Sequence, residues 1–133
     1  MFLDTSFCVD LMREQHRGTE GPATGRLRAL GDTPLCAPIF VLCELHAGAR
    51  LSGHPRRELR KVAALAERVA VAYPDATFAV AYGEMEAHLR RKGTPIPTMD
   101  LLIGTTAKIH GMPLLTRDPT HYGLIPGLVV ETY

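Results

Sequence analysis

The chain has 133 residues, of which 46% are hydrophobic and 22% charged, with a formal net charge of +1. This composition predicts one folded domain over residues 1–133 and excludes a disordered chain. The longest apolar stretch, Leu35 to Cys43, is far shorter than the roughly 20 residues that a membrane-spanning helix needs. The N-terminus has no basic stretch ahead of an apolar one, so we expect no secretory signal and a cytoplasmic location.

Three cysteines, Cys8, Cys36 and Cys43, form no C-x-x-C pair. Their odd number predicts free, buried thiols in a reducing compartment rather than a disulfide framework. The charge balance gives a second expectation. If four of the 14 acidic residues serve one metal site, 10 acidic and 15 basic residues remain, and the rest of the molecule carries a charge of +5. A basic surface around an acidic pocket suits a polyanionic substrate.

Short apolar segments alternate with helical ones along the chain. We predict strands over 1–4, 35–37, 69–72, 113–116 and 128–131, and helices over 5–15, 24–30, 38–51, 56–68, 74–92 and 97–110. This alternation predicts an α/β fold with a short parallel sheet and helices on both faces. In such sheets, chemistry gathers at the carboxyl ends of the strands, near the switch in strand order.

Two acidic residues follow predicted strands directly. Asp4 ends the first strand, where a carboxylate also serves as the cap of the next helix, and the two roles are compatible. Asp118 follows the fourth strand and precedes Pro119, which also suits an ordinary turn. A third, Asp100, lies in the first turn of the helix that starts at Pro97 and that Thr98 is expected to cap. Its alternative role is a favourable contact with the helix dipole, worth about 0.3–1 kcal/mol.

A fourth acidic residue, Glu44, lies on a helix face whose other members are apolar or small: Phe40, Val41, Ala47 and Gly48. An unpaired carboxylate buried on that face would cost several kcal/mol. The alternative is an exposed glutamate at the edge of the stripe. Two carboxylates about 4 Å apart repel by about 4 kcal/mol at an effective dielectric of 20, so four of them converge only around protons or a cation. Oxygen ligands without nearby His or Cys spacing favour Mg²⁺ or Mn²⁺.

Basic residues offer weaker candidates for phosphate contacts. One group comprises Arg56, Arg57, Arg60 and Lys61, and another comprises Arg90, Arg91 and Lys92, although a solvated helix face is the more ordinary role for both. Arg117 stands beside Asp118 and is a better candidate. Thr116, two residues before Asp118, offers a hydroxyl to a ligand or simply ends its strand.

These residues resemble the PIN-domain ribonucleases, and within them the VapC-like toxins of type II toxin–antitoxin pairs. The resemblance covers nearly the whole chain. It is carried by Phe2-Leu3-Asp4-Thr5-Ser6, Leu42-Cys43-Glu44-Leu45 with Gly48, Pro95-Ile96-Pro97 before Asp100-Leu101-Leu102-Ile103, Leu115-Thr116-Arg117-Asp118, His121-Tyr122 and Ile125-Pro126-Gly127-Leu128.

The resemblance implies a three-layer α/β/α sandwich. It implies an acidic quartet of Asp4, Glu44, Asp100 and Asp118 that is both catalytic and metal-binding, although many relatives carry Asn at the last position. It places Thr116 at a hydroxyl position of the family, and we add Thr5 and Arg117 as substrate-contacting candidates. The family usually has Phe where this chain has Tyr122, which we interpret as a change in packing.

The implied function is Mg²⁺- or Mn²⁺-dependent endonucleolytic cleavage of RNA, with transfer or ribosomal RNA as substrate. The implied partners are a cognate antitoxin and a second copy of the chain, as a homodimer or in a toxin–antitoxin hetero-oligomer. The alternative is an inactive PIN-like module that binds RNA or protein. A phosphotransfer or receiver-like domain is disfavoured, because Asp4 is followed by Thr5 and Ser6 rather than by a D-x-D motif.

Overall fold

A parallel sheet of five short strands forms the centre of the computed structural model, which describes residues 1–133. The strands are β1 (Phe2–Leu3), β2 (Cys36–Pro38), β3 (Ala70–Ala72), β4 (Leu114–Leu115) and β5 (Val130–Glu131). Their spatial order is β3-β2-β1-β4-β5, and every neighbouring pair is parallel. The chain runs outward from β1 in one direction and then returns to its other side with β4. The switch in strand order therefore lies between β1 and β4.

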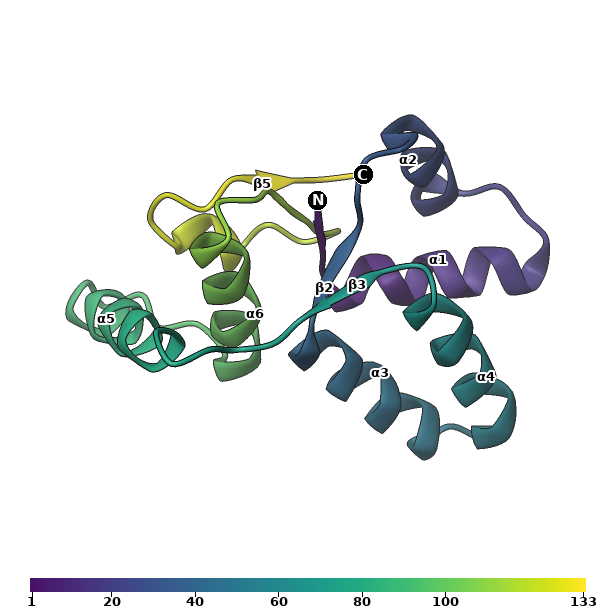
Figure 1. Ribbon diagram of the computed structural model, residues 1–133, viewed down its shortest axis with the longest axis horizontal. Helices are drawn as coiled ribbons and strands as arrows, with labels where there is room; N and C mark the ends of the chain where they lie inside the picture. The colour runs from purple at the N-terminus through teal and green to yellow at the C-terminus, as the bar shows by residue number, and fades with distance from the viewer.

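Helices cover both faces of this sheet, as the sequence predicts (Figure 1). On one side lie α1 (Thr5–Arg17), α2 (Pro22–Leu30), α3 (Ile39–Leu51) and α4 (Pro55–Ala66). On the other lie α5 (Phe78–Arg91) and α6 (Thr98–Ile109), followed by the short 3₁₀ helix η1 (Tyr122–Leu124). The three-layer α/β/α architecture is confirmed.

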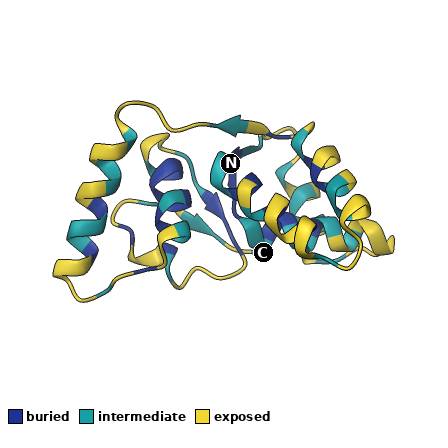
Figure 2. Ribbon diagram, turned by 90° about the horizontal axis from the view of Figure 1, so that it is seen from below, coloured by how far each residue is buried: buried dark blue, intermediate teal, exposed yellow.

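The core lies along β1 and β4. Phe2, Leu3, Leu114 and Leu115 are all at most 1% exposed, because helices cover both faces of their strands. Figure 2 shows the same pattern in the helices, whose inner faces are buried while their outer faces are exposed. Burying a side chain of this size contributes about 1.5–3 kcal/mol. The edge at which β1 and β4 end is therefore a rigid support for the residues that follow them.

Three predicted helix starts differ from the structure. The helix expected from residue 24 begins at Pro22, at the first helical position that suits proline. The helix expected from residue 74 begins at Phe78, because Asp75 forms a local turn in which its Oδ1 accepts from the Thr77 amide at 2.8 Å. The predicted cap by Thr98 is wrong. Pro97 occupies the cap position, and Thr98 is already helical with no capping bond.

The thiols also differ from expectation. Cys8 is buried, Cys36 is partly buried, and Cys43 is exposed on the outer face of α3, so the prediction of three buried thiols is wrong for Cys43. Helix periodicity explains the difference, because the residues at positions 41, 42 and 45 take the inward face of α3. No helix is both long enough and apolar enough to cross a membrane.

Candidate active site

The carboxyl ends of β1 and β4 bring two polar side chains together. Leu3 is paired with Leu115, so the residues that follow them, Asp4 and Thr116, stand side by side. The Asp4 amide donates to the Leu115 carbonyl oxygen at 3.0 Å, which fixes the backbone at this edge. Asp4 is also the N-cap of α1 and is only 6% exposed. Its predicted capping role is confirmed, and its carboxylate lies at the switch point of the sheet.

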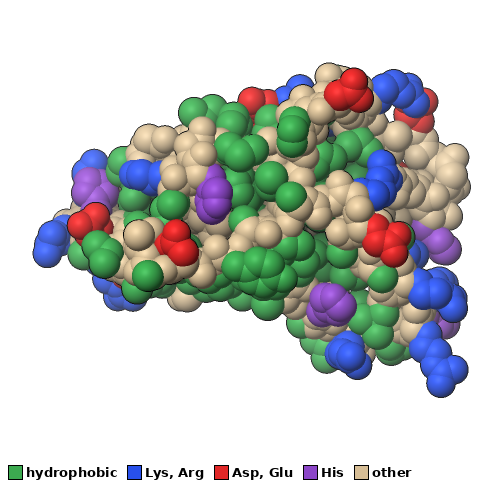
Figure 3. All heavy atoms as spheres, viewed as in Figure 1, with side chains coloured by type: hydrophobic (Ala, Val, Ile, Leu, Met, Phe, Trp, Pro, Cys, Tyr) green, Lys and Arg blue, Asp and Glu red, His purple; other side chains and the backbone are tan.

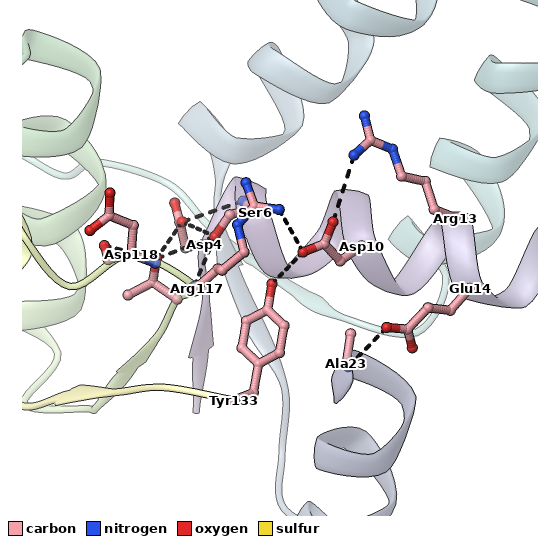
Figure 4. A network of polar contacts seen from close by, with 10 residues as sticks. Asp4, Ser6, Asp10, Arg13, Glu14, Ala23, Arg117, Asp118 and Tyr133 are labelled. Carbon is pink, nitrogen blue, oxygen red and sulfur yellow. Dashed lines mark hydrogen bonds and ion pairs between the residues drawn. The ribbon is translucent and has the colours of Figure 1, made fainter. Parts of the chain in front are cut away.

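Asp4 is held by four hydrogen bonds, none of them from a positively charged group. Its Oδ2 accepts from the Ser6 hydroxyl at 2.6 Å, the Ser6 amide at 3.3 Å and the Thr116 hydroxyl at 2.8 Å. Its Oδ1 accepts from the Tyr122 hydroxyl at 2.7 Å. Figure 4 shows Ser6 and Asp4 together with Asp118 and the backbone of Arg117, whose amide donates to the Ser6 hydroxyl at 3.1 Å. No Lys, Arg or His side chain pairs with Asp4, so no basic group of the chain competes with a cation for this carboxylate.

Glu44 and Asp100 each have one close partner near this edge. Glu44 is half-buried on α3, and its Oε2 accepts from the Thr5 hydroxyl at 2.5 Å. Because Thr5 directly follows Asp4, this bond ties α3 to the first turn of α1. Asp100 is half-buried in the first turn of α6, and its Oδ2 lies 2.6 Å from His121 Nδ1. The contact between His121 and Asp100 was not predicted, because nothing in the sequence relates two residues that lie 21 positions apart.

Asp118 is exposed, unlike the other three. Its Oδ1 accepts from the Thr120 amide at 2.9 Å and from the Thr120 hydroxyl at 2.5 Å. These bonds hold the pKa of Asp118 below its usual value, with smaller contributions from His121 and Arg117. The predicted turn role is therefore confirmed. The Asp118 amide also donates to the Thr116 hydroxyl at 3.2 Å, so the turn is anchored beside Asp4.

The negative charges of three of the acids act on the pKa of the Tyr122 hydroxyl. The residue is 3% exposed, and burial is the main cause that raises its pKa. The negative charge of Asp4 raises it further, and so do those of Asp100 and Glu44. Of the three, only Asp4 contacts the hydroxyl directly. The interpretation of Tyr122 as a change in packing is incomplete, because its hydroxyl contacts a candidate catalytic residue directly.

The donor set around this hydroxyl fits a hard divalent cation. Carboxylate oxygens with hydroxyl neighbours are the groups that Mg²⁺ and Mn²⁺ prefer. As the side chains lie, no three acidic, histidine or cysteine residues come close enough to form a complete metal-ligand group. The four-carboxylate site therefore stays a prediction.

Arg117 lies beside the site but is engaged elsewhere. Its guanidinium pairs with Asp10 Oδ2 at 2.9 Å on the outer face of α1, and the same oxygen accepts from the Tyr133 hydroxyl (Figure 4). The side chain is 59% exposed, so this pair is weak enough to be exchanged for a phosphate. Its role as a substrate contact remains a prediction.

A family model described as the PIN domain matches residues 1–123. The chain belongs to the PIN domain family. It is 30% identical over 98% of its length to the tRNA(fMet)-specific endonuclease VapC of Salmonella typhimurium, covering 96% of that protein. Within the family the chain is VapC-like.

Solved structures of VapBC complexes give the same assignment. The VapBC2 complex of Rickettsia felis, bound to a DNA fragment from its promoter, contains a chain that superposes with a TM-score of 0.89 at 25% identity. The alignment covers 99% of this chain and 97% of that one. DNA-bound VapBC from Salmonella typhimurium gives a TM-score of 0.87 at 28% identity, with 98% and 96% covered. These likenesses confirm the PIN-like fold over the whole of the chain.

Proposed function

We propose that this chain is a metal-dependent endoribonuclease and the toxin of a type II toxin–antitoxin pair. The observation that carries the proposal is the buried Asp4 carboxylate at the switch point of the sheet, where neutral donors alone hold it and no basic side chain pairs with it. The name of the Salmonella relative supports structured transfer RNA as the substrate class. The chain would act as one domain in the cytoplasm, where that RNA is found.

The cation, Mg²⁺ or Mn²⁺, would be held by Asp4, Glu44 and Asp100, with Asp118 at the exposed rim. When bound, it supplies a water molecule of lowered pKa and offsets the charge that develops on the attacked phosphate. The chain's own part is to hold the carboxylates in place. Hydroxyls and an imidazole orient them, and such supporting hydrogen bonds fix ligand geometry before substrate arrives.

A positively charged surface at the turn between α3 and α4 could bind the RNA backbone away from the cut site. The turn between α3 and α4 and the start of α4 line an open groove of about 590 Å³ with His54, Arg56, Arg57 and Arg60. Lys and Arg side chains gather over the α3–α4 corner at the lower right of Figure 3. Arg57 pairs with Glu58, whereas Arg56 and Arg60 form no ion pair. We propose that these two arginines contact the RNA backbone, and that Thr5, Thr116 and Arg117 contact the substrate nearer the cut.

The proposed protein partners are a cognate antitoxin and a second copy of the chain. The similarity to toxin chains solved within VapBC complexes supports the antitoxin. It also supports assembly as a homodimer or as a toxin–antitoxin hetero-oligomer. In that assembly, the antitoxin would hold the nuclease inactive by covering the acidic edge.

Cleavage of transfer RNA by antitoxin-free protein tests this function. The wild type should cut with Mg²⁺ or Mn²⁺ and stop when EDTA is added, because the carboxylates require the cation. Asp4→Asn and Asp100→Asn should each abolish cutting while retaining the wild-type circular dichroism spectrum. Cutting that persists in both variants would contradict the assigned site. Binding of RNA without cutting under any metal condition would instead favour an inactive binding module.

A further inference from the structure

The two carboxylate oxygens of Asp4 have unequal sets of partners. Three donors from Ser6 and Thr116 approach Oδ2 within 3.3 Å, which is more than the two lone pairs of one oxygen can serve. Oδ1 accepts a single bond, from the Tyr122 hydroxyl at 2.7 Å. One lone pair of Oδ1 therefore remains available, whereas none remains on Oδ2. The free acceptor site of Asp4 lies next to the phenol.

We propose that Tyr122 is a positioning residue that fixes Asp4 with Oδ1, and not Oδ2, toward the cation. The inference rests on the proposed function, because it assigns one oxygen of that site to the metal. Hydrogen bonds to a ligating carboxylate set its orientation, and their loss typically costs 10–100-fold in metal affinity. Tyr122 would provide this bond at Oδ1, whereas Ser6 and Thr116 bond to Oδ2.

The phenol suits this role because its ring cannot move away. Tyr122 is 3% exposed in η1, and its neighbour in the core, Ile125, is 2% exposed. The ring packs against α6 at Gly104, where an added Cβ would lie only 3.3 Å from Tyr122 Cδ1. A fixed ring holds its hydroxyl at one point. The negative charges of Asp100 and Glu44 also contribute to the raised pKa of this phenol.

Tyr122→Phe isolates the hydroxyl, because the ring and its packing are retained. Tyr133→Phe is a matched control. The Tyr133 hydroxyl also donates to an aspartate, Asp10, at 2.9 Å, but Asp10 lies outside the acidic edge. Both variants lose one hydrogen bond from a tyrosine to an aspartate. Any effect of that loss on stability alone should therefore be similar in the two variants. Only Tyr122→Phe removes a bond from a candidate metal ligand.

The test is Mn²⁺ binding by the full-length protein, measured by isothermal titration calorimetry and by the loss of the free Mn²⁺ signal in electron paramagnetic resonance. We expect Tyr122→Phe to bind Mn²⁺ at least tenfold more weakly and Tyr133→Phe to bind as the wild type does. Equal or tighter binding by Tyr122→Phe would overturn the positioning role and leave the proposed function standing. A wild type that binds no Mn²⁺ would overturn the proposed metal site and this inference together.

Discussion

Gly104 marks the closest approach between α6 and the segment that carries Tyr122. A Cβ added there would lie 2.3 Å from Ile125 Cδ1, 3.3 Å from Tyr122 Cδ1 and 3.4 Å from Leu128 Cδ2. The first distance is too short for any real contact, so Ile125 must shift in a Gly104→Ala variant. Since Ile125 is 2% exposed, it cannot turn into solvent and must displace other core atoms. The substitution therefore strains the packing of the segment that holds the Tyr122 hydroxyl against Asp4.

The magnitude follows from two opposing effects. Adding a methyl group to a well-packed core typically costs about 1–3 kcal/mol. Alanine is the better helix former than glycine by about 1 kcal/mol, which offsets part of that cost. We expect Gly104→Ala to lower the free energy of unfolding by up to about 2 kcal/mol. For a domain of this size, that corresponds to a fall of up to roughly 8 °C in Tm.

Urea unfolding followed by circular dichroism measures this difference, with Gly83→Ala as the control. Gly83 lies in α5 and has nothing within 4 Å of an added Cβ, so only the gain in helix propensity applies there. The control should be more stable than the wild type by up to about 1 kcal/mol. If both variants are stabilised alike, the close packing of α6 against η1 is wrong, and with it the argument that the Tyr122 ring is fixed.

Three further predictions concern the site and its surroundings. Asp118→Asn should reduce RNA cleavage much less than Asp4→Asn, because Asp118 is exposed and its Oδ1 is already engaged by a local turn; equal losses would contradict this. In EDTA, Arg56→Gln and Arg60→Gln should each weaken RNA binding and lower the slope of log K against log salt by roughly 0.7–0.9; an unchanged slope would rule out phosphate contacts. At pH 8, iodoacetamide should modify exposed Cys43 but spare Cys8, whose pKa burial raises to about 12; equal rates of modification would refute the buried position of Cys8.

The architecture follows from sequence patterns that act locally. Apolar segments of three to five residues between amphipathic stretches predict each of the five strands, because only a strand covered on both faces is continuously apolar. The helix starts were less predictable. Asp75 competes for the backbone of residues 74–77 through a side-chain bond, and Pro97 takes the cap position that was predicted for Thr98. Such choices depend on single hydrogen bonds that periodicity does not report.

The sequence indicates where the candidate carboxylates lie in the fold, but not which side chains bond to them. Asp4 and Asp118 follow strands, so topology alone places them at one edge of the sheet. Ser6, His121 and Tyr122 were missed as partners of these acids, because each bond depends on loop geometry between residues that are distant in sequence. Ser6 had one available signal, since a hydroxyl two residues after a helix-capping aspartate can bond back to it. The tyrosine hydroxyl had none.

The central claim is that Asp4, Glu44 and Asp100 share one divalent cation. Anomalous scattering from crystals of the full-length protein soaked in Mn²⁺ tests it most directly. We expect a Mn²⁺ peak at the carboxyl ends of β1 and β4, within coordination distance of Asp4 Oδ1 and of an oxygen of Asp100. The absence of a peak there, in crystals that bind Mn²⁺ elsewhere, would contradict the account.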